Sequence, residues 1–426
     1  MKKEIIKRLE KEKLDFWKLE VAEIEMKNIY FEKDEEESYI SGKRTDYLVT
    51  VYKKIGEKIG EASVTIKEKS EINEKIKEVI AAAKLIKNPY YTPFEKYSNY
   101  PKLKKAKELP SYEEIKKKVR EAYDEIKKTD AKLNALEVFT KKSKINVTTS
   151  IGQELSEEHN SAYAECVVTV KGKRGEMEYV PMRSESNLNQ IDLRSFVKNC
   201  YINAKDISNS TSPRMFRGKV ILSGDALAEF IVPTIHENPI IIHSSAKMKY
   251  LNISKLELGK NFEKIKADKI TMKSNPLIEG GLRNSAFDSN LVPARELDII
   301  KDGVFTNFFA SKRYADYLKI KPTGPLGNIE LGTGKISADE FYKDGVCEIV
   351  GFSSFAPNIY SGDFTAEIRL GYYIKDGKKT PFKGGMLVGN YFKLMANVVL
   401  SKEKFFKSGY YGPKAIMFND AVISGL

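Results

Sequence analysis

Three Asp-Gly pairs divide the second half of this chain into short segments of β type. They stand in IIKDGVF (299–305), YKDGVCEIV (342–350) and YYIKDGKKTPF (372–382), and each is flanked by residues that favour strands. Asp-Gly suits the tightest hairpin turns because both central residues of such a turn need a positive φ. The carboxy-terminal half is therefore predicted to be a β-rich domain, built as a sheet or a barrel-like structure.

The amino-terminal half mixes helical and strand patterns. Apolar residues recur at helical spacing in 71–86 and 113–128, and a further helix is expected over 190–204. Segments 46–66 and 162–182 alternate as hairpins around glycine turns. The predicted fold class is α+β, with an α/β amino-terminal region followed by the β-rich carboxy-terminal domain.

Changes of composition along the chain predict its domain boundaries. A Pro- and Tyr-rich stretch without periodicity is expected to be a linker or a strap, and the Ser/Pro-rich NSTSPRMFRG is expected to end the first half. The predicted divisions are an amino-terminal α+β domain at 1–88, the linker or strap at 89–110, a middle α+β region at 111–208, a boundary at 209–217, and the carboxy-terminal domain at 218–426.

The net charge is +13, from 72 basic and 59 acidic residues. Most lysines alternate with acids, as in EEIKKKVREAYDEIKK (113–128), which is typical of solvated helix faces. A surface that binds nucleic acid needs its Lys and Arg side chains gathered on one face. Nucleic acid is therefore not the expected partner.

No apolar run approaches the length of a membrane span, so no membrane partner is expected. The basic start MKKEIIKRLEKEKLDFW lacks the continuous apolar region of a signal peptide. Cys166, Cys200 and Cys347 are odd in number and far apart, which is typical of neither a disulfide framework nor a cysteine metal site. We expect a protein of the reducing cytoplasm.

The stretch HENPIIIH (236–243) holds two of the three histidines and raises the possibility of a zinc site. His236 and His243 are seven residues apart, which on a helix separates them by about 10 Å along the axis, at 1.5 Å per residue. Pro239 would also break such a helix. The main expectation is structural histidines, with His243 ending a buried strand. A loop that brings His236, Glu237 and His243 together stays open as an alternative.

Three stretches of the carboxy-terminal half resemble the TldD/PmbA family, formerly called modulators of DNA gyrase. GKVILSGDALAEFIVPTI (218–235) is similar to the strand and helix that open the family's carboxy-terminal domain. The block 275–324 resembles a family pattern of Gly-Leu, Phe-Asp and an Ile-x-Asp-Gly turn, and 361–390 resembles its Thr-Gly-Asp-Phe signature and closing Gly-Asn, with Ser361 in place of Thr. Asp288 and Asp363 within these blocks are expected to brace loops.

The resemblance also implies where a metal site would lie. Members of the TldD type carry His-Glu-x-x-x-His on the first helix of the carboxy-terminal domain and a Cys near the carboxy terminus. In this chain the two His positions hold Val232 and Glu237, and the catalytic Glu position holds Pro233. Tyr410 and Tyr411 stand in SGYYGPKAIMF, where the Cys is expected.

The resemblance therefore implies a TldE/PmbA-like subunit without zinc, cofactor or catalytic residues of its own. Its expected partner is a TldD-like catalytic subunit that holds the zinc, in a heterodimer that degrades or matures short or unfolded peptides; a homodimer is possible in isolation. One alternative is a peptidase in its own right, with a relocated metal site at His236, Glu237 and His243, helped by His159. The other is a binding protein associated with DNA or gyrase.

Overall fold

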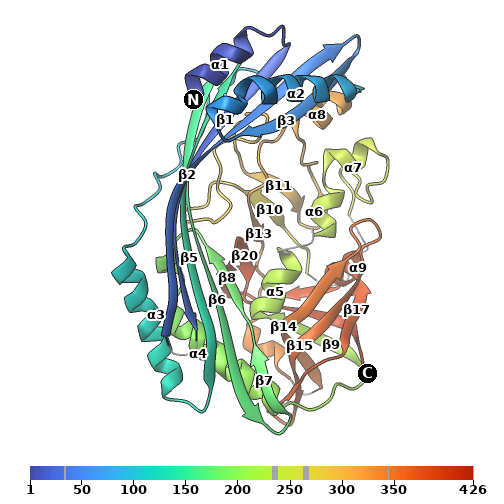
Figure 1. Cartoon of the computed structure of the whole chain (residues 1–426). Coiled ribbons are helices and arrows are strands. Elements are labelled where there is room, and N and C mark those ends of the chain that lie inside the picture. Colours follow the sequence, from blue (N-terminus) through green and yellow to red (C-terminus); the bar gives the residue numbers. More distant parts are fainter. Residues whose placement is uncertain (33–34, 233–237, 262–267, 344, 426) are drawn as a thin grey trace.

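The computed structural model of the protein describes residues 1–32, 35–232, 238–261, 268–343 and 345–425. Long curved strands of the amino-terminal half form one side of the molecule, and the carboxy-terminal half lies beside them (Figure 1). No helix of the described residues is both long and apolar enough to cross a membrane.

The amino-terminal sheet has the strand order β4-β3-β2-β1-β5-β6-β7, with β8 also paired to β6. Its strands are β1 (Phe16–Glu32), β2 (Glu35–Ile55), β3 (Lys58–Ile66), β4 (Asn88–Pro89), β5 (Lys132–Thr149), β6 (Glu154–Gly172), β7 (Gly175–Tyr179) and β8 (Met182–Glu185). The predicted hairpins at 46–66 and 162–182 are confirmed as β2–β3 and β6–β7. Because β1 pairs with β5 in antiparallel register, strands from 1–88 and from 111–208 share this one sheet.

Four helices pack on one face of β1. They are α1 (Lys2–Glu10), α2 (Ile72–Leu85), α3 (Tyr112–Lys127) and α4 (Leu193–Ser208). Trp17 and Val21 share a core with α1 and α2, whereas Ile29 and Phe31 share a core with α3 and α4. Alternate residues of a strand point to the same face, so all four helices cover that face. The predicted helices are confirmed, the last of them displaced so that it follows its N-cap Asp192.

The Pro- and Tyr-rich segment after β4 wraps around the free edge of β6. Tyr100 packs on the face of the sheet that the helices leave uncovered, together with Phe287. At the edge, Asn160 accepts a hydrogen bond from the Lys107 amide at 2.6 Å and donates one to the Lys107 carbonyl at 2.9 Å. The segment then reaches the helical face, where Lys27 donates to the Pro110 carbonyl at 3.1 Å.

The carboxy-terminal half contains a seven-stranded sheet whose central strands close into a ring. The closed order is β14-β9-β21-β17-β15-β14, since β14 also pairs with β15. The strands are β9 (Phe216–Ser223), β14 (Val346–Pro357), β15 (Asp363–Lys375), β16 (Lys378–Phe382), β17 (Met386–Asn390), β18 (Val398–Leu400) and β21 (Ala415–Ser424). Closure removes the exposed edges of the ring strands, and the barrel-like prediction is confirmed.

A six-stranded sheet of order β12-β11-β10-β13-β20-β19 packs beside the ring. It consists of β10 (Met272–Asn275), β11 (Leu297–Lys301), β12 (Val304–Phe305), β13 (Asn328–Leu331), β19 (Lys404–Lys407) and β20 (Tyr410–Pro413). The helices of this half are α5 (Gly224–Ile231), α6 (Pro239–His243), α7 (Ala246–Tyr250), α8 (Lys312–Leu318) and α9 (Tyr391–Met395). Short 3₁₀ helices are η1 (Lys69–Glu71), η2 (Leu188–Gln190) and η3 (Ala338–Phe341).

Two of the three Asp-Gly pairs form hairpin turns. Asp302-Gly303 joins β11 to β12 and Asp376-Gly377 joins β15 to β16, all four residues with positive φ. The third pair does not join two strands, because η3 precedes it and β14 follows; its Asp is outside the described residues. An Asp-Gly pair forms a hairpin turn only when the segments on both sides of it pair as strands.

Candidate functional site

Helix α5 begins the stretch that resembles the family's metal-motif helix. Gly224 opens it with φ +55°, and the helix ends at Ile231. Val232 follows as the C-cap, 8% exposed, within the large apolar core of the carboxy-terminal half. The first ligand position of the motif is therefore a buried apolar side chain. Pro233, His236 and Glu237 lie outside the described residues.

A closed hydrogen-bond network lies beside the end of α5. The hydroxyl of Tyr391, which is fully buried, donates to the Phe230 carbonyl at 3.0 Å. Asn238 donates to this hydroxyl at 2.6 Å and to the Ile231 carbonyl at 2.9 Å. The Tyr391 ring stacks on Phe230 at 4.5 Å between centroids. These groups satisfy one another, and the network holds α5 against α9.

His243 ends a short helix and not a strand, so that expectation was wrong. Pro239 is the first residue of α6, where its missing N–H costs nothing and its fixed φ suits the helix. The His243 ring is fully buried. Its Nε2 lies 3.0 Å from the Tyr360 carbonyl, and its Nδ1 accepts the Lys255 amide at 2.9 Å. Burial lowers the pKa of His243. Both nitrogens of a neutral ring are thus engaged, and neither is free to bind a metal.

The tyrosines at the expected Cys position lie on β20. Tyr410 is buried and donates to the Pro413 carbonyl at 3.0 Å. Tyr411 stacks on Phe406 at 6.0 Å and lines a cavity of about 380 Å³ that also includes Glu330. Burial, then Glu185 and Glu330, raise the pKa of Tyr411. A neutral phenol occupies the position where the resemblance places a metal-binding thiolate.

The remaining histidine, His159, is on β6 of the amino-terminal sheet, 3.1 Å from Glu157. Glu157 in turn accepts the Ala286 amide at 2.7 Å, so this pair braces a contact between the two halves. His243 is on α6, in the other half of the chain. Among the described residues, no group of three or more His, Cys, Asp or Glu side chains is arranged to hold a metal ion.

Asp288 braces a loop through main-chain amides, as predicted, whereas Asp363 makes a side-chain contact between two strands. One Asp288 oxygen accepts the amides of Asn290 and Val292, at 2.8 and 2.9 Å. Asp363 accepts a hydrogen bond from Asn390 at 2.9 Å, where β15 and β17 pair. The signature residues of these stretches therefore maintain the fold.

A charged cluster that the sequence did not reveal joins α5 to β19. Lys407, 9% exposed, forms an ion pair with Asp225, and the Tyr179 hydroxyl donates to Asp225 at 3.3 Å. Glu229, one turn further along α5, has no hydrogen-bond partner in the described part of the chain. Burial and the neighbouring Asp225 raise the pKa of Glu229 to about 7. We call Asp225, Glu229, Lys407 and Tyr179 the α5–β19 cluster.

The α5–β19 cluster can exchange a proton near neutral pH through Glu229. Asp225, Lys407 and Tyr179 also line a cavity of about 290 Å³ against α4. The sequence signal was the pair of acids four residues apart in the otherwise apolar segment DALAEF. That spacing places both acids on one helix face, but the buried lysine that joins them comes from a strand 182 residues later.

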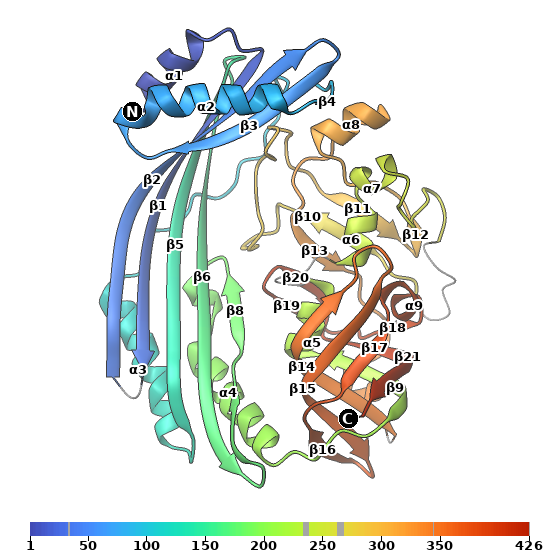
Figure 2. The same cartoon turned by 45° about the vertical axis from the view of Figure 1, so that its right-hand side comes forward.

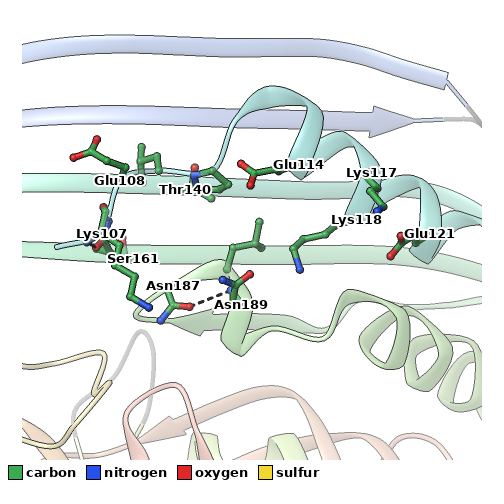
Figure 3. Close-up of a pocket in the computed structure, with 14 residues that line it drawn as sticks. Lys107, Glu108, Glu114, Lys117, Lys118, Glu121, Thr140, Ser161, Asn187 and Asn189 are labelled. Carbon is green, nitrogen blue, oxygen red and sulfur yellow. Dashed lines mark hydrogen bonds between the residues drawn. The ribbon is translucent and has the colours of Figure 1, made fainter.

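A larger polar cavity of about 550 Å³ lies between the wrapping segment, α3 and η2 (Figure 3). Its charged lining residues are Lys107, Glu108, Glu114, Lys117, Lys118 and Glu121. Glu114 caps α3 through Ser111, and Glu108 pairs with Lys142. Because the signs are mixed, the cavity has no strong field for a ligand of one charge.

Comparison with known proteins finds relatives of this chain. Residues 217–425 match the model of the PmbA/TldA metallopeptidase C-terminal domain. An uncharacterized protein of Methanocaldococcus jannaschii is 26% identical over 204 residues, 43% of this chain and 45% of the relative. Metalloprotease PmbA of Escherichia coli O157:H7 is 29% identical over 152 residues, 33% of this chain and 32% of the relative. The chain thus spans less than half the length of these curated relatives.

Solved structures share the whole fold. A protein of Thermotoga maritima named as a modulator of a DNA gyrase superposes with a TM-score of 0.81 at 16% identity, covering 99% of both chains. TldE of Thermococcus kodakarensis gives a TM-score of 0.77 at 19% identity, covering 100% of both chains. The carboxy-terminal domain at 217–425 therefore belongs to the PmbA/TldA metallopeptidase family, and the whole chain shares the fold of these solved structures.

Proposed function

We propose that this chain is a zinc-free, TldE/PmbA-like subunit that assembles with a TldD-like catalytic chain. The observation that carries the proposal is the end of α5. Val232 is packed in the core at the first ligand position, and the Tyr391–Asn238 network lies beside it. The second ligand position, Glu237, does not restore a His, and Tyr411 replaces the thiolate. Zinc at a catalytic site needs three protein ligands and one open position, so this set of residues does not fit zinc.

The role that remains is to help enclose the partner's reaction site. Enclosure makes a peptidase selective, because a folded protein cannot enter a closed space whereas a short or unfolded peptide can. An extended peptide can be held through main-chain hydrogen bonds along a strand, which tolerate many sequences. Such a role suits a chain that has the fold of these structures but no metal ligands at Val232 and Tyr411, and the expected setting is the cytoplasm.

Metal content and assembly test the proposal together. The chain is expressed alone and with a TldD-like chain, and each product is sized and analysed for zinc. We expect no stoichiometric zinc in the isolated chain, and a heterodimer carrying about one zinc in the co-expressed sample. Tightly bound zinc in the isolated chain, or a chain that ignores its partner during sizing, contradicts the proposal.

The rival hypothesis is a peptidase with its own metal site. It predicts that the histidines are required for activity. In the assembled complex, His236→Ala and His243→Ala are expected to keep kcat/KM on a short unstructured peptide within a few-fold of the parent. His159→Ala, which removes the residue that helps the rival's metal site, is expected to retain activity in the same way. A metal ligand or general base instead costs about 10²-fold or more. Such a loss in a complex that stays folded and assembled favours the rival.

A further inference from the structure

A cavity lies on the face of the six-stranded sheet that does not pack in the core. Its volume is about 380 Å³, and cavities that bind small molecules have about 300–1,000 Å³. Lys273, Glu330, Tyr411 and Phe406 are neighbours in the register of β10, β13, β20 and β19. Neighbours in register share a face of the sheet, so these four side chains form one row along the cavity. In Figure 2, β13, β20 and β19 lie in the middle of the molecule.

A glycine forms part of the lining of this cavity. Gly332 follows Glu330 by two positions, directly after β13, so both residues face the same side. The backbone does not require a glycine here, because its φ is not positive. An added Cβ would lie 3.4 Å from the Cβ of Thr271, which is an ordinary van der Waals contact. The absence of a side chain at Gly332 therefore leaves space that the fold itself does not need.

Three charged residues line the cavity: Lys273, Glu330 and Lys404. The Lys273 ammonium is already paired with two carboxylates, at 3.8 and 3.6 Å. One oxygen of Glu330 accepts a hydrogen bond from the side-chain amide of Asn275 at 2.6 Å. Its other oxygen has no partner in the part of the chain that the structure describes, and the Lys404 ammonium has none there either. One carboxylate oxygen and one ammonium group are therefore available to a ligand.

An aromatic wall separates these two charges. Lys404 precedes Phe406 by two positions on β19, so Glu330 and Lys404 are two strands and two residues apart. At about 4.8 Å per strand and 3.3 Å per residue, their Cα atoms are about 12 Å apart. Between them Phe406 and Tyr411 stack with ring centroids 6.0 Å apart, and Phe406 is 55% exposed. A ligand with opposite charges at its two ends therefore matches the cavity.

We infer that this cavity binds a peptide of two or three residues by its two free ends, with the α-amino group at Glu330 and the α-carboxylate at Lys404. An extended chain spans at most about 3.3–3.6 Å per residue, so three residues reach about 10 Å and a single amino acid does not bridge the two charges. Hydrogen bonds to charged groups are among the stronger ones, and the aromatic wall can cover an apolar side chain. The inference goes beyond the proposed subunit role and does not depend on it, because every group it uses belongs to this chain.

Blocking the ends of the peptide tests the two charges. Isothermal titration calorimetry of the isolated full chain compares the tripeptide Gly-Tyr-Gly with its N-acetylated form, its C-amidated form and free tyrosine. We expect the tripeptide with free ends to bind. Each block is expected to weaken binding by about tenfold or more, because it removes one charge-assisted hydrogen bond. Free tyrosine is expected to bind at least as weakly as the blocked peptides, because it is too short to reach both charges.

Variants assign each end of the peptide to its residue. Glu330→Gln is expected to weaken binding of the free tripeptide by about tenfold or more and to leave the affinity for the N-acetylated peptide unchanged. Lys404→Met is expected to show the same pattern with the C-amidated peptide. Glu367→Gln and Lys402→Met, which change exposed residues outside the cavity, are the matched controls. Only a residue that contacts one end of the peptide gives such a selective loss.

Gly332→Ala tests the space separately from the charges. It is expected to weaken binding of all three peptides without a change in the circular dichroism spectrum, because the added methyl group fits the fold but occupies the cavity. Four results overturn the inference. They are a free tripeptide that does not bind, blocked peptides that bind as well as the free one, a loss in Glu330→Gln that is equal for all peptides, and unchanged binding in Gly332→Ala.

Discussion

Single residues at the end of α5 and in α6 make apolar or main-chain contacts. Val232 contributes only apolar surface, and His243 uses both ring nitrogens for main-chain groups. The main-chain carbonyls at the end of α5 accept hydrogen bonds from Tyr391 and Asn238. These two residues join α5, α6 and α9. A buried polar group is stable only when it is hydrogen-bonded, so this network has a measurable energy.

Tyr391→Phe is expected to lower the free energy of unfolding by about 1–3 kcal/mol. The substitution leaves the Phe230 carbonyl and an Asn238 N–H buried without the hydroxyl they share. Urea denaturation of parent and variant measures the difference. Tyr360→Phe is the control, because that side chain is 59% exposed and should change stability by less than about 0.5 kcal/mol. Equal stabilities of parent and Tyr391→Phe would contradict this account of the network.

At the scale of elements, α5 carries apolar residues into the core on one face and two acids toward β19 on the other. Asp225 forms an ion pair with the ammonium group of Lys407. Glu229 has no partner of opposite charge at hydrogen-bond distance in the described residues. Its carboxylate is therefore disfavoured in the folded state. This makes the α5–β19 cluster sensitive to pH near neutrality.

Glu229→Gln is expected to stabilise the fold at pH 8 relative to the parent, and to lose that advantage toward pH 5. The pKa of Glu229 is raised from 4.5 to about 7 on folding. The parent's contribution is thus fully present below about pH 4.5 and is lost as the pH rises through 7. Partial exposure reduces the effect to about 1–3 kcal/mol. Unfolding curves at pH 5, 6.5 and 8 measure it, and a difference that is the same at all three pH values contradicts the assignment.

At the scale of the whole molecule, the two halves share their cores. Leu370 of β15, fully buried, belongs to the core of α3, α4 and the amino-terminal sheet, and Tyr372 packs beside it. The Tyr372 hydroxyl also donates to Asp206 of α4 at 2.6 Å. On the other side, Thr92 and Asp316 hydrogen-bond across the same division at 2.9 Å. Because of these contacts, we expect the two halves to unfold together.

Leu370→Ala is expected to destabilise the whole chain by about 2–5 kcal/mol, because it leaves a cavity in a core that both halves build. Scanning calorimetry should show one transition, moved to lower temperature, in which both halves unfold together. Leu85→Ala, at a residue that is 82% exposed, is the control. Two separated transitions in the variant would show that the halves fold independently.

The local elements were largely predictable, because their signals are local. Period-3.6 and period-2 patterns and the turn chemistry of Asp302-Gly303 depend on residues within a few positions. The error at Pro239 was also local. Asn238 followed by Pro239 is the N-cap and first residue of a helix, a pattern that outweighs the strand tendency of the three isoleucines.

The sequence also determined which residues stand where the resemblance places the metal motif, since residue identity and spacing are properties of the chain. Only the tertiary structure decided that β1 pairs with β5, that β14 closes the ring onto β15, and that Lys407 reaches Asp225. The reason is physical. Strand partners, burial and raised pKa values depend on which distant segments exclude water together, and residue order states no such contact.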